Sequence, residues 1–406
     1  MSAALDWHPE DPATLADPYP TFERMRNEDP CYWSLRLRSW VLTRYDDVKA
    51  VCLDRGKLSS DRLRPFFASL PGPQAERIGS IMRYLSLWMV FKDPPEHTRL
   101  RRLTSRVFHA KSMQAMRPQI EEIADWLIDR IGDQQEFDFI AEFAGPLPCL
   151  VIMALLGVAR EDLAAVKRMS DDMALLIGSS RTSPEKYDTA EKARQEMAAF
   201  FRDLIERRRA EPAQDLISEL IALRDGEDRL SEDELIATCI LLLFAGHETT
   251  TNHLANGMLS LMRYPDQMDK LRQRPELVVG AVEELLRYDG PSGAQVRLVN
   301  QAYELHGKSL APGERMFVML NSANRDPRVF ERADTLDIER SGYTHLTFGY
   351  GMHVCMGFPL ARTEGQVAFP KVLAAFSQLE PVGDQTWVNS LVFRGMHGLK
   401  VRARRA

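Results

Sequence analysis

The strongest chemical feature of this 406-residue chain is a cysteine in a glycine-containing loop near its C-terminus. Phe348, Gly351, Cys355 and Gly357 follow the spacing Phe-x-x-Gly-x-x-x-Cys-x-Gly. The two glycines allow a sharp turn and a close approach of the backbone to a flat ligand. The amides after Cys355 are expected to open a helix, whose N-terminus favours an anionic sulfur. The motif therefore predicts a thiolate that ligates iron in a macrocycle, although a buried structural cysteine in a turn is the alternative that it leaves open.

A second group of polar residues interrupts a long apolar segment. The sequence AGHETT (residues 245–250) lies midway along it. A carboxylate and hydroxyls are costly inside a buried helix unless they have partners, so Glu248 and Thr249 indicate a function, with hydrogen bonding to neighbouring helices as the alternative. Gly246 and the threonines are also expected to loosen the helix and open a groove, because hydroxyls compete for backbone carbonyls. His247 is expected to pack in the core rather than to bind a metal.

Two further motifs combine acidic and basic residues. Glu284 and Arg287 are three residues apart, so they can pair on one face of a helix. In the sequence DPPEHTRLR, which begins at Asp93, the aspartate can cap a helix, and His97 and Arg101 then share one of its faces. Such groups suit buried carboxylates, although arginines on an exposed helix are more often merely solvated.

These four motifs resemble those of the cytochrome P450 family, specifically its soluble bacterial members, and the likeness extends over nearly the whole chain. The resemblance implies a haem b cofactor with Cys355 as axial ligand, and insertion of one oxygen atom from dioxygen into a hydrophobic small molecule. It implies that Glu248 and Thr249 relay protons, and that Glu284 and Arg287 form a structural pair for folding and haem retention. It places further residues around the haem: Phe348, Gly351 and Gly357 in the ligand loop, and His97, Arg101, Arg297 and His353 toward the propionates.

The substrate pocket is predicted partly from spacing and partly from the resemblance. Leu241, Ala245 and Thr249 recur every four residues, so they should line one helix face over the haem. The resemblance adds, from the same helix and from loops, Leu85, Leu87, Phe244, Gly293, Ala294 and Phe393. Ordinary core packing is the alternative for each of them. Aromatic residues and arginines alternate between residues 62 and 91, which would suit a terpenoid, fatty acyl chain, steroid or aromatic acid without distinguishing among them.

Electron delivery is expected to need a separate protein. No flavin-binding or iron–sulfur cysteine pattern follows Cys355. Arg99, Arg102, Arg106 and Lys111 continue the basic character beside the predicted cysteine side of the haem, where the resemblance implies docking of a small acidic ferredoxin or flavodoxin served by an NAD(P)H reductase. A peroxide-dependent haem hydroxylase and a non-catalytic haem-binding or sensor protein are the rival functions, and the presence of the acid–alcohol pair argues against both.

The composition excludes several other classes of protein. A formal net charge of -6 gives no overall attraction to nucleic acid or anionic membranes. The five cysteines are scattered without zinc spacing. The N-terminal residues lack the pattern of a signal peptide, and the longest apolar run is far short of the roughly 20 residues that span a bilayer. We therefore expect a cytoplasmic protein, monomeric, with no nucleic-acid or membrane partner.

Helical periodicity dominates the elements that must position these residues. Apolar residues recur three and four apart over 120–131, 190–208, 231–263 and 277–288, whereas strand-like alternation is confined to 40–43, 315–319 and 399–401. We predict a mainly α protein, a helical bundle around haem with small β-sheets, folded as a single domain over residues 1–406.

Two local features refine this prediction. Ser231 and Glu234 form a plausible capping box for the long apolar helix, and Pro265 marks its end. In the helix after the ligand loop, Gly365 and Pro370 depart from the family pattern. Pro370 is expected to kink that helix near residue 366.

Overall fold

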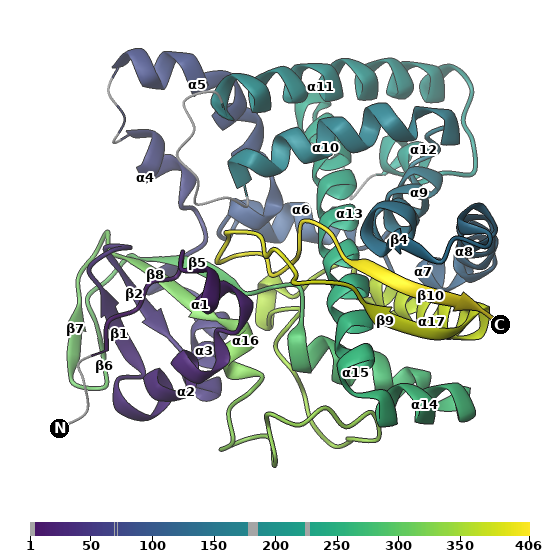
Figure 1. Ribbon diagram of the computed structural model, residues 1–406. Helices are drawn as coiled ribbons and strands as arrows, with labels where there is room; N and C mark the ends of the chain where they lie inside the picture. The colour runs from purple at the N-terminus through teal and green to yellow at the C-terminus, as the bar shows by residue number, and fades with distance from the viewer. Residues whose placement is uncertain (1–4, 69, 71, 178–185, 224–227) are drawn as a thin grey trace.

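The computed structural model describes residues 5–406 apart from 69, 71, 178–185 and 224–227 (Figure 1). Its α-helices are α1 (Pro12–Ala16), α2 (Tyr19–Glu28), α3 (Tyr45–Leu53), α4 (Leu63–Ala68), α5 (Gly72–Leu85), α6 (Glu96–Thr104), α7 (Ala110–Ala115), α8 (Arg117–Ile131), α9 (Pro146–Leu155), α10 (Leu163–Ile177), α11 (Lys186–Ala210), α12 (Leu216–Ala222), α13 (Glu232–Arg263), α14 (Pro265–Gln273), α15 (Val278–Asp289), α16 (Leu320–Ala323) and α17 (Phe358–Ala375). The four helices expected from periodicity correspond to α8, α11, α13 and α15, so the mainly α fold is confirmed.

The strands form small sheets at the edges of the helical body. They are β1 (Cys31–Ser34), β2 (Ser39–Leu42), β3 (Leu58–Ser59), β4 (Glu136–Asp138), β5 (Ala294–Val299), β6 (Tyr303–Leu305), β7 (Lys308–Leu310), β8 (Arg315–Met319), β9 (Phe376–Pro381) and β10 (Lys400–Arg405). The largest sheet has the order β1-β2-β8-β5-β3, with β2 and β8 parallel and its other neighbours antiparallel. The three expected strands correspond to β2, β8 and β10.

Helix α13 runs through the centre of the molecule (Figure 1) and packs against α9, α11, α15 and α17. The expected capping box is present: Glu234 N donates to Ser231 Oγ over 3.2 Å, and Ser231 N donates to Glu234 Oε2 over 2.9 Å. No helix in the described ranges is long and apolar enough to cross a membrane.

The expected loosening of α13 around Gly246 is not observed. The segment stays helical from end to end, and Thr249 Oγ1 donates to the Ala245 carbonyl over 2.9 Å without breaking it. A Cβ at Gly246 would lie 3.1 Å from Ile152 Cγ1 of α9. The glycine therefore allows two helices to approach closely, and tight packing around α13 outweighs the competition from its hydroxyls.

Helix α17 is continuous, and the kink expected near residue 366 stays a prediction. It spans Phe358–Ala375 as one helix with Pro370 inside it, although Pro370 cannot supply the backbone donor that the Gln366 carbonyl would otherwise receive. Gly365 has a packing role, because a Cβ there would lie 3.1 Å from His253 Nε2 of α13 and 3.2 Å from Val282 Cγ2 of α15. The two departures from the family pattern are thus accommodated within a continuous helix between α13 and α15.

The predicted pairing of Glu284 with Arg287 is confirmed. Both side chains are fully buried, and Arg287 Nε and Nη2 donate to the two carboxylate oxygens over 2.7 and 2.8 Å. Arg287 Nη1 also donates to the carbonyls of Asn324 and Ala333. A residue that the sequence did not single out joins them, since Arg340 Nε donates to Glu284 over 3.2 Å. The pair therefore ties α15 to the long segment that leads to the Cys355 loop.

Candidate functional site

A cavity of about 280 Å³, called here the central cavity, separates α13 from the loop that carries Cys355. Its wall joins segments far apart in the sequence, among them His97, Arg101, Leu241, Ala245, Thr249, Phe348, His353, Cys355, Gly357, Leu360 and Glu364. A second cavity of about 230 Å³, the adjoining cavity, shares Leu241, Ala245, Thr249 and His353 with it. The two cavities bring together the predicted cysteine and the predicted acid–alcohol pair.

The loop around Cys355 presents its thiol to the central cavity just before α17 begins. Cys355 N donates to the Phe348 carbonyl over 2.8 Å, which closes the turn. Burial raises the pKa of the Cys355 thiol, hydrogen bonds from the amides of Gly357 and Phe358 and the charge of Arg101 lower it, and the pKa ends above its ordinary value. These donors suit an anionic sulfur, and a bound metal ion would deprotonate the thiol outright.

The two motif glycines have different roles. Gly351 has φ +71° and packs so closely that a Cβ would lie 2.6 Å from the Cys52 carbonyl, so a side chain is excluded there on both grounds. Gly357 has φ -81°, which every residue adopts. The prediction that it provides special backbone freedom is therefore wrong. Its missing side chain leaves space beside the thiol, since a Cβ would lie 3.9 Å from Cys355 Sγ.

Cationic and donor groups gather on one side of the central cavity. His97 is buried, and its Nε2 has no hydrogen-bond partner among the described residues. Its ring lies 4.2 Å from that of His353, whose Nε2 is 3.0 Å from Ser60 Oγ. Burial and the neighbouring charges of His97, Arg297 and Arg101 lower the pKa of His353 to about 3. This side of the cavity therefore has an excess of positive charge and a buried hydrogen-bond donor, His97 Nε2, that can bind an acceptor of a ligand.

The expected helix cap before His97 takes another form. Asp93 does not cap α6, which begins at Glu96 without a side-chain cap. Its carboxylate instead accepts hydrogen bonds from Ser59 Oγ over 2.5 Å and from Ser60 N over 2.9 Å. These bonds fix the segment after β3 beside the cavity, because two donors there compete successfully for the same carboxylate.

Arg297 lies on β5 and lines the adjoining cavity. Its guanidinium donates to the Val296 carbonyl and to Gln295 Oε1, over 2.9 and 3.0 Å. Arg101, from α6, donates to the Val354 carbonyl of the ligand loop over 2.9 Å. The cavity has a thiol on one wall, an apolar interior, and a cationic side on which the His97 donor is still free among the described residues. These features fit a flat, dianionic, iron-containing group such as haem.

The acid–alcohol pair faces the cavities from α13. Thr249 lines both cavities, and Glu248 lines the adjoining one. Asn252 Nδ2 donates to Glu248 Oε1 over 3.3 Å. Burial and the charge of Asp171 raise the pKa of Glu248, whereas the Asn252 hydrogen bond and the charge of Lys167 lower it, and the pKa ends above its ordinary value. A carboxyl with a raised pKa beside a hydroxyl can supply protons to that hydroxyl.

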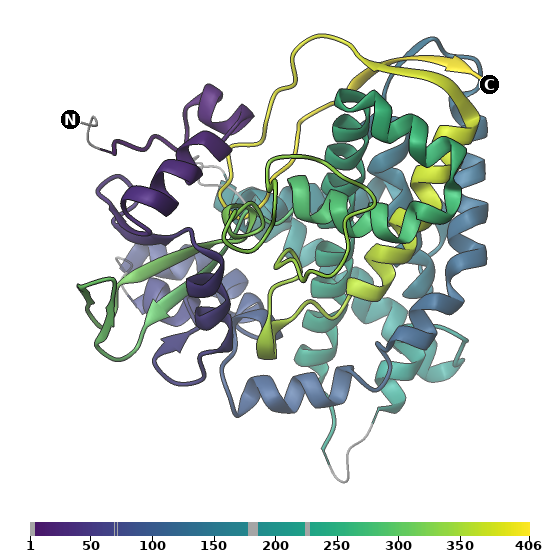
Figure 2. The same ribbon diagram turned by 90° about the horizontal axis from the view of Figure 1, so that it is seen from below.

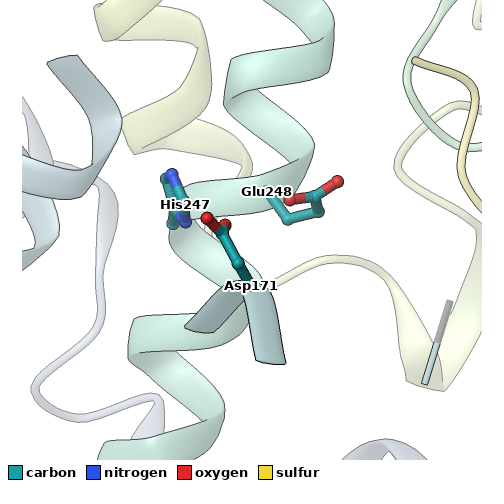
Figure 3. Close-up of side chains that lie close together, drawn as sticks. All are labelled: Asp171, His247 and Glu248. Carbon is teal, nitrogen blue, oxygen red and sulfur yellow. The ribbon is translucent and has the colours of Figure 1, made fainter. Parts of the chain in front are cut away.

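Glu248 has two further neighbours, which Figure 3 shows with it. The ligand atoms of Asp171 on α10, His247 and Glu248 lie within 4.8 Å of one another. Asp171 is exposed and already paired with Lys167 Nζ over 2.6 Å, and burial lowers the pKa of His247 to about 4. Because Asp171 already has a cationic partner, we interpret the cluster as the electrostatic environment of Glu248 rather than as a metal site.

Sequence reasoning missed a polar group between α13 and α17. Glu364 and His253 line the central cavity beside Thr250. In the part of the chain that the structure describes, neither ring nitrogen of His253 has a hydrogen-bond partner, and Glu364 Oε1 has none. Burial raises the pKa of Glu364 to about 8, so the carboxyl is neutral at pH 7. The lone Glu364 carries no spacing signal that would have distinguished it from other acids in the sequence.

The predicted pocket residues divide into two sets. Leu241 and Ala245 line both cavities, and Phe244, Ala294 and Phe393 line the adjoining one. Leu85, Leu87 and Gly293 line neither of the two. Leu85 ends α5 and packs in the main core together with Leu87, and the following 3₁₀ helix (Met89–Phe91) supplies Met89 and Val90 instead. Gly293 lines a separate crevice of about 50 Å³ near the N-terminal segment.

Part of the predicted basic surface is paired with acidic residues of the same chain. Arg99 Nη1 donates to Asp228 over 3.0 Å, and its Nη2 pairs with Glu234 at the start of α13. Arg99 is therefore used to tie α6 to α13. Arg102, Arg106 and Lys111 are exposed, and Arg102 Nη2 lies 3.9 Å from Asp228 Oδ2.

Comparisons with known proteins agree with this site. The family model described as "Cytochrome P450" matches residues 30–391. The chain is 35% identical to the "Putative cytochrome P450 YjiB" of Bacillus subtilis (strain 168), covering 95% of this chain and 93% of that one. It is 36% identical to the "6-deoxyerythronolide B hydroxylase" of Saccharopolyspora erythraea, covering 95% and 96%.

A solved structure shows the same fold. The structure titled "Crystal Structure of P450BioI in complex with hexadec-9Z-enoic acid ligated Acyl Carrier Protein" has a TM-score of 0.88 and 33% identity, covering 97% of this chain and 99% of that one. The chain therefore belongs to the cytochrome P450 family and is a haem b-dependent, oxygen-inserting oxidoreductase.

Proposed function

We propose that this monooxygenase inserts one oxygen atom from dioxygen into a hydrophobic small molecule, with electrons from a separate ferredoxin or flavodoxin and its NAD(P)H reductase. The single observation that supports this most is the placement of Thr249 on α13 at the central cavity that Cys355 also lines, with Glu248 beside it at the adjoining cavity. When bound, haem with a thiolate ligand supplies the oxygen activation. The chain supplies the ligand, the protons and the shape of the site.

Each of the main side chains at the site would have a separate role in this reaction. Cys355 would ligate the iron, and the amides of Gly357 and Phe358 would tune its sulfur. Thr249 would hold a proton nearest to the reacting oxygen, and Glu248 would replace it from the side of Asp171. His97, which has the unpartnered Nε2, would donate to a haem propionate together with other cationic groups of the site.

A hydrophobic substrate is supported by the aromatic wall of the adjoining cavity. Trp88 stacks on Phe244 at 5.8 Å, and Phe244 meets Phe393 edge-on at 6.3 Å. The relatives named above include a hydroxylase of 6-deoxyerythronolide B and a protein bound to a fatty acyl chain on a carrier protein. Both names are consistent with a largely apolar substrate.

The exposed cations Arg102, Arg106 and Lys111 support docking of an acidic electron carrier on the Cys355 side. We also infer a single haem domain over residues 1–406, a monomer, and a cytoplasmic location, the last supported by five cysteines that are all free thiols.

One experiment separates this function from the two rivals. Product formation is measured with NADH, ferredoxin reductase and ferredoxin, and in parallel with hydrogen peroxide alone. We expect product only, or predominantly, in the electron-fed reaction. Faster turnover with peroxide would favour the peroxide-dependent hydroxylase, and reduction without any product would favour a non-catalytic haem protein.

The docking surface is tested in the same assay. The double change Arg102→Gln and Arg106→Gln should slow electron transfer from an acidic ferredoxin at low salt and weaken its salt dependence, because surface charge steers encounter. Arg36→Gln, at an exposed arginine close to the N-terminal segment, is the control and should leave the rate unchanged. An unaltered rate in the double variant would place the docking surface elsewhere.

A further inference from the structure

The adjoining cavity contains an arginine that none of the motifs explains. Arg62 lies between β3 and α4, is half-buried, and lines this cavity together with Ser60, Phe91 and Arg297. Its guanidinium stacks over the Phe91 ring at 4.9 Å. Stacking fixes the plane of a guanidinium and leaves its N–H edge free to meet an acceptor.

Among the residues that the structure describes, Arg62 has no acidic partner. Two acids of this region already have partners, because Asp61 pairs with Arg64 over 2.7 Å and Asp93 accepts from Ser59 and Ser60. The charged groups that act on Arg62 are Arg297 and Arg315, both cations. Together with burial they lower the pKa of Arg62 to about 10, which leaves it charged at neutral pH.

The other carboxyl in this cavity does not compensate Arg62. Glu248 interacts with Asn252, Asp171 and Lys167 on α10 and α13, and Arg62 is not among the groups that shift its pKa. An uncompensated cation beside an apolar wall is costly unless an anion joins it. The adjoining cavity is therefore built for an anionic group next to an apolar one.

From this geometry we infer that the substrate carries a carboxylate and that Arg62 binds it, so that the substrate class is an amphipathic acid with an apolar body. The inference rests on the proposed function of this cavity as the substrate site. A haem propionate is the other source of a carboxylate here. His97, Arg101, Arg297 and His353 already surround the cavities as partners for two propionates, so Arg62 is an additional cation.

Matched ligands test the inference with the holoenzyme. The probes are decanoic acid and 2-naphthoic acid, each compared with its methyl ester, and dissociation constants are read from the ligand-induced shift of the Soret band. At least one acid should bind about tenfold to a hundredfold more tightly than its ester, which is the fold-change expected for one charge-assisted hydrogen-bonded pair.

Three variants assign the effect to one side chain. Arg62→Gln should bring the acid-to-ester ratio close to one while leaving ester binding intact, and Arg62→Lys, which keeps the charge, should retain part of the preference. Arg64→Gln is the matched control, because Arg64 is exposed and paired with Asp61. It should keep the full ratio.

Several results would overturn the inference. The first is equal affinity of the wild type for acid and ester. The second is no shift of the Soret band with either acid. The third is an acid-to-ester affinity ratio that is unchanged in Arg62→Gln. Faster haem transfer from Arg62→Gln to apomyoglobin with an unchanged acid-to-ester ratio would assign Arg62 to a propionate instead. Acids that bind in an Arg62-dependent manner but yield no product in the electron-fed assay would refute the monooxygenase proposal and leave the binding inference standing.

Discussion

At the scale of single residues, the proposed reaction depends on a hydroxyl and a carboxyl at two neighbouring positions of α13. Thr249 carries the hydroxyl that both cavities share, and Glu248 carries a carboxyl whose pKa is raised. The hydroxyl now donates to the Ala245 carbonyl of its own helix. It can rotate toward the cavity without any change of backbone, as the proposed proton relay requires.

Thr249→Ala should uncouple the reaction. Without the hydroxyl the proton nearest to the reacting oxygen is lost, so reduced cofactor should be consumed at a comparable rate while hydrogen peroxide replaces most of the product. Glu248→Gln should instead slow turnover about a hundredfold, because the supply of protons fails. Cofactor, peroxide and product are measured side by side. Thr251→Ala removes a hydroxyl that donates to the His247 carbonyl, and it should remain coupled; full coupling in Thr249→Ala would refute the role of the pair.

The charges beside Glu248 predict opposite shifts of its pKa. Asp171 raises that pKa and Lys167 lowers it. Asp171→Asn should therefore move the limb of the pH–turnover profile that reports Glu248 to lower pH, and Lys167→Gln should move it to higher pH. Asp172→Asn, next in sequence and paired with Arg168, serves as the control without a shift. Movement of both test variants in one direction would contradict this electrostatic arrangement.

Residues could be predicted where the chemistry lies in one short stretch of sequence. The loop of Cys355 follows from local spacing, and His97 and Arg101 follow from a short motif that resembles the family's; all three lie at the central cavity. Leu85 and Gly293 were misplaced, because pocket lining depends on the direction in which a chain leaves a helix or strand. Arg62 could be seen in the sequence, but its lack of an acidic partner is visible only in three dimensions.

At the scale of elements, the interface of α13 and α17 holds a neutral acid. Burial raises the pKa of Glu364 to about 8. Between about pH 4.5 and pH 8 the unfolded chain loses this proton while the folded protein keeps it, so Glu364 makes stability fall as pH rises, by about 1.4 kcal/mol per pH unit. Below about pH 4.5 both states are protonated and the penalty vanishes.

Glu364→Gln should remove this pH dependence and make the protein more stable than the wild type near pH 8, as measured by urea unfolding from pH 5 to pH 8. Glu283→Gln provides a control of opposite sign. His345 and Arg362 lower the pKa of Glu283 to about 2 despite its burial, so its stabilisation is present throughout this pH range and its loss should be independent of pH. A pH slope unchanged by Glu364→Gln would show that Glu364 ionises in the folded protein.

Element boundaries were predictable where capping and periodicity agree, as at Ser231 and along α13. The expectation that failed concerned the interior of α13. Gly246, Gly365 and Pro370 would weaken an isolated helix, yet α13 and α17 stay continuous because each packs closely against its neighbours. Helix propensity is a local quantity, and tertiary packing outweighed it here.

At the scale of the whole molecule, segments from opposite ends of the sequence converge on one cavity. Figure 2 shows the purple N-terminal segments on one side of the molecule and the yellow C-terminal helix on the opposite side. His97 on α6 and Cys355, just before α17, both line the central cavity. A group that contacts both would hold these segments together, so haem should also stabilise the fold by mass action.

Cys355 is the proposed thiolate ligand of the haem iron, and the function proposed for the site depends on it. The most direct test is the absorption spectrum of the dithionite-reduced protein under carbon monoxide. The wild type should show the strongly red-shifted Soret band that an anionic sulfur ligand produces, Cys239→Ala should keep it, and Cys355→Ala should lose it. An unshifted band in the wild type, or a shifted band that persists in Cys355→Ala, would contradict ligation of the haem iron by the Cys355 thiolate.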